Sequence, residues 1–311
     1  MGKNNSRRNF VPAETDSAIN TNQAAFTGRP ATGGAPAYVF ACVLLLLFTF
    51  ALFGFGLAQG DDHAGNAQQI IDRSLEAIKA DFAAAPHFDC TERYQNDSGS
   101  KTFRNLMIEG SQYQELIAVN GKPLSPEKKQ LESQKLQSEI AKRRSESPTQ
   151  RSQRIAKYQA DRKRDNDLVA ELTKAFAFSL TGEDQLDGHH VYVLQATPRP
   201  GYHPINRDTQ VLTAMKGKLF IDTQTFQWVK VEAQVTHPVA IEGLLARVEP
   251  GTRFELEKMP VTPDVWMAKH FSMKSHSRIF FIFPHQKDED ETFWNYTPSR
   301  YSTDRNQSPS R

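Results

Sequence analysis

The chain has 311 residues, 38% of them apolar, with 38 Lys and Arg against 36 Asp and Glu. Residues 1–58 hold four of these basic and two of these acidic side chains, which leaves 34 of each sign in the remainder, so its charge gives no reason to expect nucleic acid or another polyanion as a partner. Of the two cysteines only Cys90 lies beyond residue 58, which excludes an intramolecular disulfide and a Cys-rich metal site there.

An uninterrupted apolar segment spans residues 37–58 and contains no charged side chain. At ~1.5 Å per residue, a helix of this length crosses the ~30 Å hydrocarbon layer of a membrane. The tail before it, residues 1–36, is predicted to be disordered and has a basic excess, which keeps it in the cytoplasm. A signal peptide cleaved near Ala58 and a transmembrane anchor both remain open. Either one exports the rest of the chain to the periplasm or cell envelope.

An amphipathic helix is predicted after a polar spacer at 60–65. Apolar residues there recur at spacings of four, three and four, as one helical stripe: Ile71, Leu75, Ile78 and Phe82. Pro86 prevents the helix from continuing. Extended segments at 88–94, 103–109 and 113–119, separated by turn-forming residues, then predict a three-stranded antiparallel meander.

The composition changes between residues 122 and 164, where 13 Lys and Arg stand against five Asp and Glu and strand-forming residues disappear. Helix-forming residues predict one helix at about 126–144, and a capping-box signature that begins at Ser147 predicts a second. An apolar stripe returns only at the far end of this second helix, as Leu168, Leu172, Ala175 and Phe176. We expect a helical insertion at about 124–178 that docks on the body through that end.

The basic excess of this insertion has two interpretations. Its side chains can bind anionic lipid headgroups or an acidic partner, at ~1 kcal/mol for each Lys or Arg near such a surface. Alternatively, the charges only keep a solvated helical insertion in solution. Membrane-surface helices show a broad apolar face, whereas Leu131, Leu136 and Ile140 form a thin one. We therefore favour the solvated insertion.

Beyond residue 184 the sequence predicts antiparallel strands, at 190–196, 217–222, 228–235, 252–258 and 265–283. In the strand at 228–235, alternation predicts one buried and one solvent-exposed face. The buried face is predicted to carry Val229, Val231, Ala233 and Val235, and the exposed face Trp228, Lys230, Glu232 and Gln234. The tail at 298–311 has little to bury and is expected to be disordered. Short antiparallel strands with helices segregated to one side predict an α+β fold.

No nucleophile elbow, phosphate-binding loop or dinucleotide fingerprint occurs in the sequence. His270 and His276 share a face of their strand but lie roughly 20 Å apart, too far for one metal ion. The acidic residues at 183–187 and 288–291 lack the ligand set of a calcium loop and are interpreted as solvated turn charges. We expect no metal, no cofactor and no enzymatic activity. An enzyme would need a polar cleft in which His270 or His276 meets a carboxylate.

A family resemblance rests on the order of elements and on one hairpin pattern, Gly217-x-Leu219-x-Ile221-Asp222 continuing to Trp228-Val229-x-Val231. In both respects the chain is similar to the outer-membrane lipoprotein-sorting proteins, a superfamily that includes the periplasmic lipoprotein carrier. The similarity covers roughly residues 69–297, within an expected domain at 62–297. It implies a curved antiparallel sheet or incomplete β-barrel, packed on helices that plug its open side around an apolar cavity for acyl chains.

The resemblance implies that the inner face of this half-barrel lines the cavity. The apolar residues that suit this role are Val229, Val231, Phe271, Met273, Ile279, Phe281 and Phe283. The expected function is the binding of an acyl chain or a lipidated protein by a non-enzymatic envelope protein, in lipoprotein sorting or envelope sensing. The alternative is a membrane-anchored structural or signalling module that binds a protein partner through its sheet edge or basic helices, without lipid.

Overall fold

The computed structural model describes residues 61–205, 209–241, 246–279 and 283–301. The predicted N-terminal tail and the apolar segment 37–58 lie outside the described residues, so the predictions about them stay open. Among the helices of the described part, none combines the length and the apolar composition needed to cross a membrane.

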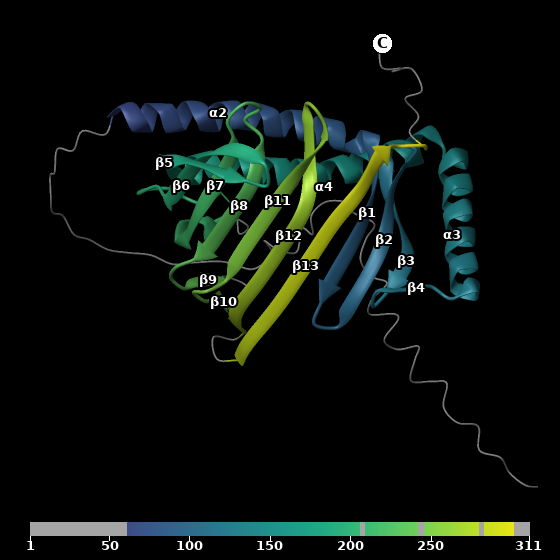
Figure 1. The fold of residues 1–311 in the computed structure, drawn as a ribbon. Coiled ribbons are helices and arrows are strands. Elements are labelled where there is room, and N and C mark those ends of the chain that lie inside the picture. Colours follow the sequence, from purple (N-terminus) through teal and green to yellow (C-terminus); the bar gives the residue numbers. More distant parts are fainter. Residues whose placement is uncertain (1–60, 206–208, 242–245, 280–282, 302–311) are drawn as a thin grey trace, which may run out of the picture.

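Antiparallel strands form one curved sheet that makes up the body of the molecule (Figure 1). The strands are β1 (Phe88–Asn96), β2 (Gly99–Ile108), β3 (Ser111–Val119), β4 (Lys122–Pro123), β5 (Phe176–Leu186), β6 (His189–Pro198), β7 (Met215–Asp222), β8 (Trp228–Val235), β9 (Val239–Ile241), β10 (Ala246–Val248), β11 (Arg253–Thr262), β12 (Val265–Ile279) and β13 (Phe283–Pro298).

The order of neighbouring strands is β4-β3-β2-β1-β13-β12-β11-β8-β7-β6-β5, and the short β10 pairs with β12 and β9. Because β4 and β5 stand at opposite ends of this order, the sheet does not close. Helices α2 (Asp61–Ala84), α3 (Pro126–Ser145) and α4 (Pro148–Ala175) accompany it, with α2 and α4 lying across one end of the strands and α3 beside β3 (Figure 1). The predicted α+β fold with an incomplete barrel is confirmed.

The predicted apolar stripe of α2 packs against the sheet. Ile71 and Ile78 are buried in the main hydrophobic core, and Leu75 and Phe82 pack against it. The helix ends in a 3-10 turn that contains Pro86, because proline cannot continue the backbone hydrogen-bond ladder. The rest of this core lies between α2, the end of α4 and strands β5–β8, with Phe176, Leu194, Leu212, Leu219, Ile221 and Trp228 among its buried members.

The junction of α3 and α4 is attached to the turn between β2 and β3. The predicted capping box is present, since the backbone N–H of Gln150 donates to Ser147 Oγ at 3.3 Å and that of Ser147 donates to Gln150 Oε1 at 3.0 Å. Arg143 of α3 and Arg154 of α4 both reach Ser111 at the start of β3, at 2.8 Å to its carbonyl and 2.7 Å to its hydroxyl oxygen. Two guanidinium groups therefore hold the helical insertion in place.

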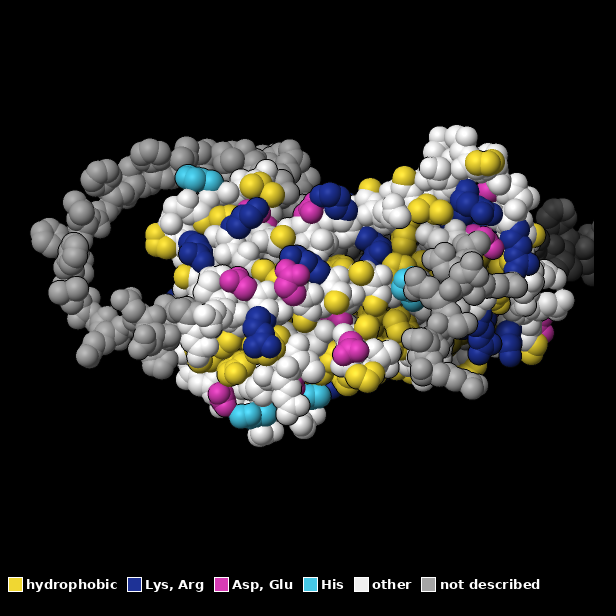
Figure 2. All heavy atoms as spheres, turned by 90° about the horizontal axis from the view of Figure 1, so that it is seen from above, with side chains coloured by type: hydrophobic (Ala, Val, Ile, Leu, Met, Phe, Trp, Pro, Cys, Tyr) yellow, Lys and Arg dark blue, Asp and Glu magenta, His cyan; other side chains and the backbone are white. Residues whose placement is uncertain are grey.

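Part of the basic excess of the insertion is paired with acidic side chains where the insertion faces solvent. In Figure 2 the end of the molecule that carries α3 shows several Lys and Arg side chains with Asp and Glu among them. Lys135 lies 2.7 Å from Glu132 and Lys142 lies 3.4 Å from Glu139, each pair one turn apart on α3. Such exposed pairs contribute about 0–1 kcal/mol each.

Two predictions about the strand after α4 are wrong. Phe176 begins β5 instead of ending the helix, with φ −116° and ψ 144° and Pro198 as its partner in β6. Glu183 and Asp184, expected in a turn, lie within β5 opposite Tyr192 and Val191. The strand continues through these polar residues because its neighbour β6 supplies the hydrogen bonds.

Of the strand predicted at 265–283, residues 265–279 form β12, residues 280–282 lie outside the described residues, and Phe283 begins a further strand. β12 ends at Ile279, and β13, which was not predicted, runs from Phe283 to Pro298 between β12 and β1. The acidic residues 288–291, expected in a turn, therefore lie in a central strand, where Glu289 accepts a hydrogen bond from Tyr94 at 2.7 Å. Tyr301, expected in the C-terminal tail, accepts a hydrogen bond at its carbonyl oxygen from the backbone N–H of Glu109 at 3.1 Å, and residues 302–311 lie outside the described residues.

Candidate apolar binding site

A cavity of about 310 Å³ lies between helices α2 and α4 and the inner face of the sheet. The cavity is lined by side chains from α2 and α4 and from strands β1–β3, β8 and β11–β13. Segments far apart in the sequence therefore form one lining. Its apolar lining includes Ile78, Phe82, Phe88, Met107, Val169, Leu256, Met267 and Phe293. The cavity is apolar along most of its surface and therefore suits an apolar ligand.

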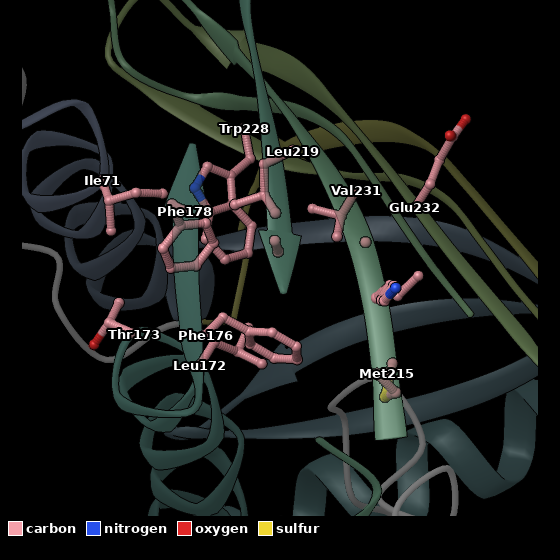
Figure 3. A pocket seen from close by; sticks show the side chains of 14 residues that line it. Ile71, Leu172, Thr173, Phe176, Phe178, Met215, Leu219, Trp228, Val231 and Glu232 are labelled. Atoms are coloured by element: carbon pink, nitrogen blue, oxygen red, sulfur yellow. The ribbon is translucent and has the colours of Figure 1, made fainter. Parts of the chain in front are cut away.

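A second cavity of about 60 Å³ also lies between α2, α4 and the sheet (Figure 3). In Figure 3, Ile71 of α2 and Leu172 of α4 face the side chains of strands β5, β7 and β8 across it. Those side chains include Phe176, Phe178, Met215, Leu219, Trp228 and Val231. Trp228 belongs to the lining of both the larger and the smaller cavity.

Trp228 points inward because β8 contains a β-bulge. Trp228 is paired with Ile221 and Lys230 with Phe220, so Val229 is an extra residue between two consecutive pairs. A bulge of this kind re-aims the side chains on its two sides. Trp228 joins the main core with Ile221, whereas Val229 packs in a separate cluster with Val191 and Trp266. The strict alternation that was predicted for this strand is therefore wrong at its first two residues.

A hydrogen bond to α2 fixes the indole of Trp228. Its Nε1–H donates to Ser74 Oγ at 3.1 Å, and the Ser74 hydroxyl donates to the Ile71 carbonyl oxygen at 2.8 Å. Trp228 is 6% exposed and Ser74 is fully buried. A buried indole N–H that finds an acceptor keeps one orientation, because leaving it unpaired costs about 1–3 kcal/mol.

One wall of the larger cavity is polar. Glu92 Oε2 accepts hydrogen bonds from Asn105 Nδ2 at 2.7 Å and from Gln114 Nε2 at 3.1 Å, across strands β1, β2 and β3. All three residues line the cavity. Cys90 lies beside them, and burial raises the pKa of its thiol to about 12. This wall offers hydrogen-bonding groups to a ligand whose remainder is apolar.

A buried ion pair joins α2 to the strands at the cavity. Lys258 of β11 contacts the carboxylate of Asp81, which also accepts hydrogen bonds from Gln227 Nε2 at 3.1 Å and from the Trp266 backbone N–H at 2.8 Å. Burial lowers the pKa of Lys258, while Asp81 opposes that shift. Two strands, β11 and β12, and the residue that precedes β8 therefore bind one turn of α2.

The predicted cavity residues do not form one site. Val231 lines the smaller cavity, and Val229 lies in the separate cluster described above. Met273 is buried and Phe271 half-buried, opposite Phe254 and Leu256 in β11, and neither lines one of the two cavities. Phe281 lies outside the described residues, as do the side chains of Ile279 and Phe283. A role for these residues in binding stays a prediction.

The alternation pattern missed the residues of the larger cavity. Leu256 and Met267 line the larger cavity from β11 and β12, but neither was among the predicted cavity residues. Trp228 was predicted to lie on the solvent-exposed face. The signal for Trp228 was the apolar pair Trp228-Val229 at the start of β8, since two adjacent apolar residues break a two-residue period.

The other face of the sheet carries cross-strand ion pairs around an open hollow of about 760 Å³. His270 Nε2 lies 2.7 Å from Asp290 Oδ2 there, so a histidine does meet a carboxylate. Oxygen atoms of Glu255 and Glu257 lie within 4.8 Å of a His270 ring nitrogen, a spacing that a metal ion would require. Lys230 Nζ, however, lies 2.9 Å from Glu255 Oε1 and supplies a positive charge to this group.

No family profile matches the sequence, and no curated protein matches it. Among solved structures, the chain is similar to an outer membrane lipoprotein-sorting protein domain from Vibrio parahaemolyticus, with 13% identity and a TM-score of 0.30 over 74% of this chain and 94% of the other. It is also similar to a LolA superfamily protein from Nitrosomonas europaea, with 12% identity and a TM-score of 0.31 over 75% and 93%. A DUF1329 family protein from Desulfovibrio piger matches with 9% identity and a TM-score of 0.30 over 76% and 95%.

The resemblance that the order of elements predicted is thus found among solved structures. At these identities and TM-scores the likeness carries no argument about what this chain binds. The function is therefore inferred from the cavities and their walls.

Proposed function

We propose that the chain binds an acyl chain, free or attached to a lipid or protein, in the cavity beneath α2 and α4, without making or breaking a bond. The carrying observation is the apolar cavity of about 310 Å³, which falls within the ~300–1,000 Å³ of small-molecule sites. Withdrawing each methylene from water contributes ~0.8 kcal/mol. Met107 and Met267 in its lining support the proposal, because unbranched thioether side chains adapt to a flexible chain.

The polar wall supports an amphiphilic ligand. Glu92, Asn105 and Gln114 hydrogen-bond one another on this wall. Amide and carboxylate groups can also bond the headgroup or peptide next to an acyl chain, because each has several donor or acceptor positions. The ligand of this site is therefore a molecule with an apolar chain and a polar end.

The proposal places this activity in the periplasm or cell envelope, in lipoprotein sorting or lipid sensing. Its support there is the apolar segment 37–58, which is long enough to direct export. A chain released by cleavage near Ala58 would carry its ligand across the compartment. A chain anchored by that segment would sense the ligand or pass it on close to the membrane.

Lipid analysis of the purified full chain tests the proposal. We expect acyl lipids to co-purify and a fluorescent fatty acid to displace them. Leu256→Asp, in the cavity wall, should abolish uptake, because it places a charge against the bound chain. Leu131→Asp is the matched control, since Leu131 lies 50% exposed on α3 and should leave uptake unchanged. Absence of both co-purified lipid and uptake by the folded wild-type chain would contradict the proposal.

A module that binds a protein partner without lipid is the second candidate. Two exposed apolar side chains favour it, Ile117 on β3 and Leu131 on α3. Among the described strands, β5 also pairs on one side only, with β6, and an extended peptide can add to such an edge. A chain that takes up no fatty acid and binds its partner equally well with Leu256→Asp would favour this candidate.

A further inference from the structure

We propose that the indole of Trp228 divides one acyl-chain site into two compartments and sets the length of chain that the site accepts. The inference rests on the proposed function. Its starting observation is that Trp228 alone, among the described residues, lines both the cavity of about 310 Å³ and the cavity of about 60 Å³.

Both cavities run beneath the same two helices, one behind the other. On α2, Ile71 lines the smaller cavity and Ile78 the larger, a separation of seven residues or ~10 Å along the helix. Ser74, which holds the indole, lies between these two residues on α2. On α4, Leu172 lines the smaller cavity and Val169 the larger. Along α2, the indole of Trp228 is therefore held between the residue that lines the smaller cavity and the residue that lines the larger one.

The sheet gives the same order. Val231 of β8 lines the smaller cavity, and its cross-strand partner Leu256 in β11 lines the larger. The floor thus continues from one cavity to the other through a pair of adjacent apolar side chains. Removing the indole would leave one continuous apolar channel under α2 and α4.

The hydrogen bond to Ser74 makes Trp228 a fixed barrier. The indole N–H donates to Ser74 Oγ at 3.1 Å, and swinging the ring aside would leave this N–H without its buried acceptor. A chain that fills the larger cavity therefore stops at the ring. Each methylene beyond that length adds no burial in the wild type, whereas in a variant without the ring it raises affinity about fourfold.

Photo-crosslinking locates the end of the bound chain. The purified full chain, in lipid nanodiscs, is exposed to fatty acids from octanoic to octadecanoic acid that carry a terminal diazirine, and labelled peptides are identified by mass spectrometry. In the wild type, label should stay near Ile78 and Met267 at every length. In Trp228→Leu, the longer chains should label Phe178 and Met215 of the smaller cavity.

Two further variants complete the test. Ser74→Ala keeps the indole but removes its acceptor, and should move part of the long-chain label into the smaller cavity; it also carries the test if Trp228→Leu fails to fold. Trp294→Leu is the control, because Trp294 lines neither cavity and pairs with Thr91 in β1. Its labelling should equal that of the wild type.

The outcomes separate this inference from the function on which it rests. Label on Phe178 or Met215 in the wild type, or an unchanged pattern in the folded variants, would overturn the role of Trp228 and leave chain binding standing. A wild-type chain that is labelled in neither cavity would overturn the proposed function and this inference together.

Discussion

Arg143 of α3 donates a hydrogen bond to the carbonyl oxygen of Ile108, at 2.9 Å, where β2 ends. The same guanidinium donates to the carbonyl oxygens of Ser111 and Gln112 at 2.8 and 3.3 Å. Arg143 is 3% exposed although it is charged, and Glu139 one turn before it lies 2.8 Å away. One buried cation therefore donates to three backbone carbonyl groups around the β2–β3 turn.

Replacing Arg143 by methionine should lower the free energy of unfolding by about 2–4 kcal/mol. The substitution keeps the apolar stem but removes the hydrogen bonds that these buried carbonyl groups accept from Arg143. Urea-induced unfolding measures the change. Arg144→Met is the control, because Arg144 is largely exposed and lies 3.8 Å from Glu109; its effect should stay below about 0.5 kcal/mol. Equal effects of the two variants would contradict the buried role of Arg143.

Lys258→Met should destabilise the chain by about 3–5 kcal/mol, because it leaves the buried carboxylate of Asp81 without a cation. The double variant Asp81→Asn, Lys258→Met should recover part of this loss, since it removes the stranded charge. Thermal unfolding of the two variants compares them. Lys135→Met, at an exposed pair with Glu132, should change stability by at most about 1 kcal/mol. A double variant less stable than Lys258→Met would show that the unpaired carboxylate of Asp81 is not what destabilises Lys258→Met.

Because the thiol of Cys90 is buried, we expect the chain to lose stability at alkaline pH. Burial raises the thiol pKa from 9.0 to about 12, so between these values the folded chain holds a proton that the unfolded chain has released. Stability from this group is complete below pH 9 and falls as the pH rises toward 12. By pH 10 the wild type should have lost about 1 kcal/mol more than Cys90→Ala, relative to each protein at pH 8. Unfolding curves of both at the two pH values test this, and parallel losses would contradict it.

Gly217 of β7 should not tolerate a side chain. A Cβ atom at this position would lie 2.7 Å from the backbone carbonyl oxygen of Glu232 in β8. Because that atom is backbone, the two strands would have to separate, and Gly217→Ala should cost about 1–3 kcal/mol. Chemical denaturation measures the loss. Gly217 also lines the smaller cavity. An unchanged stability would mean that β7 and β8 can separate at this position at no cost, and would contradict the prediction.

The helices and the first meander could be predicted because their signals are local. The stripe from Ile71 to Phe82, the capping box at Ser147 and the three strands before residue 120 each depend on residues close in sequence. A repeat of four or of two residues, together with a cap or a turn, specifies such an element without knowledge of its neighbours.

β13 could not be predicted in the same way. Its residues 288–291 are all acidic and resemble a solvated turn, yet the strand lies in the middle of the sheet. Partners on neighbouring strands explain this: Tyr94 donates to Glu289, and Arg93 and His270 both lie near Asp290. A pattern within one segment contains no information about such partners.

The candidate site was predictable in kind but not in detail. The inner face of a half-barrel was expected to be apolar, and Val231 lies on it. The bulge at Val229 decides whether Trp228 or Val229 points inward, and a single extra residue reverses the face of its neighbours. Its position depends on the pairing with β7, which the spacing of apolar residues in β8 does not reveal.

The pairing of β1 with β13 imposes an order on folding. Tyr94 and Glu289 meet across this seam although 195 residues separate them along the chain. A chain that emerges from its N-terminus forms the β1–β3 meander early, but this meander gains its second neighbour only when β13 arrives. Long-range pairing of this kind is slow. The two walls of the cavity therefore stay apart until nearly the whole chain is available, and a chain shortened before β13 would lack the pairing that joins them.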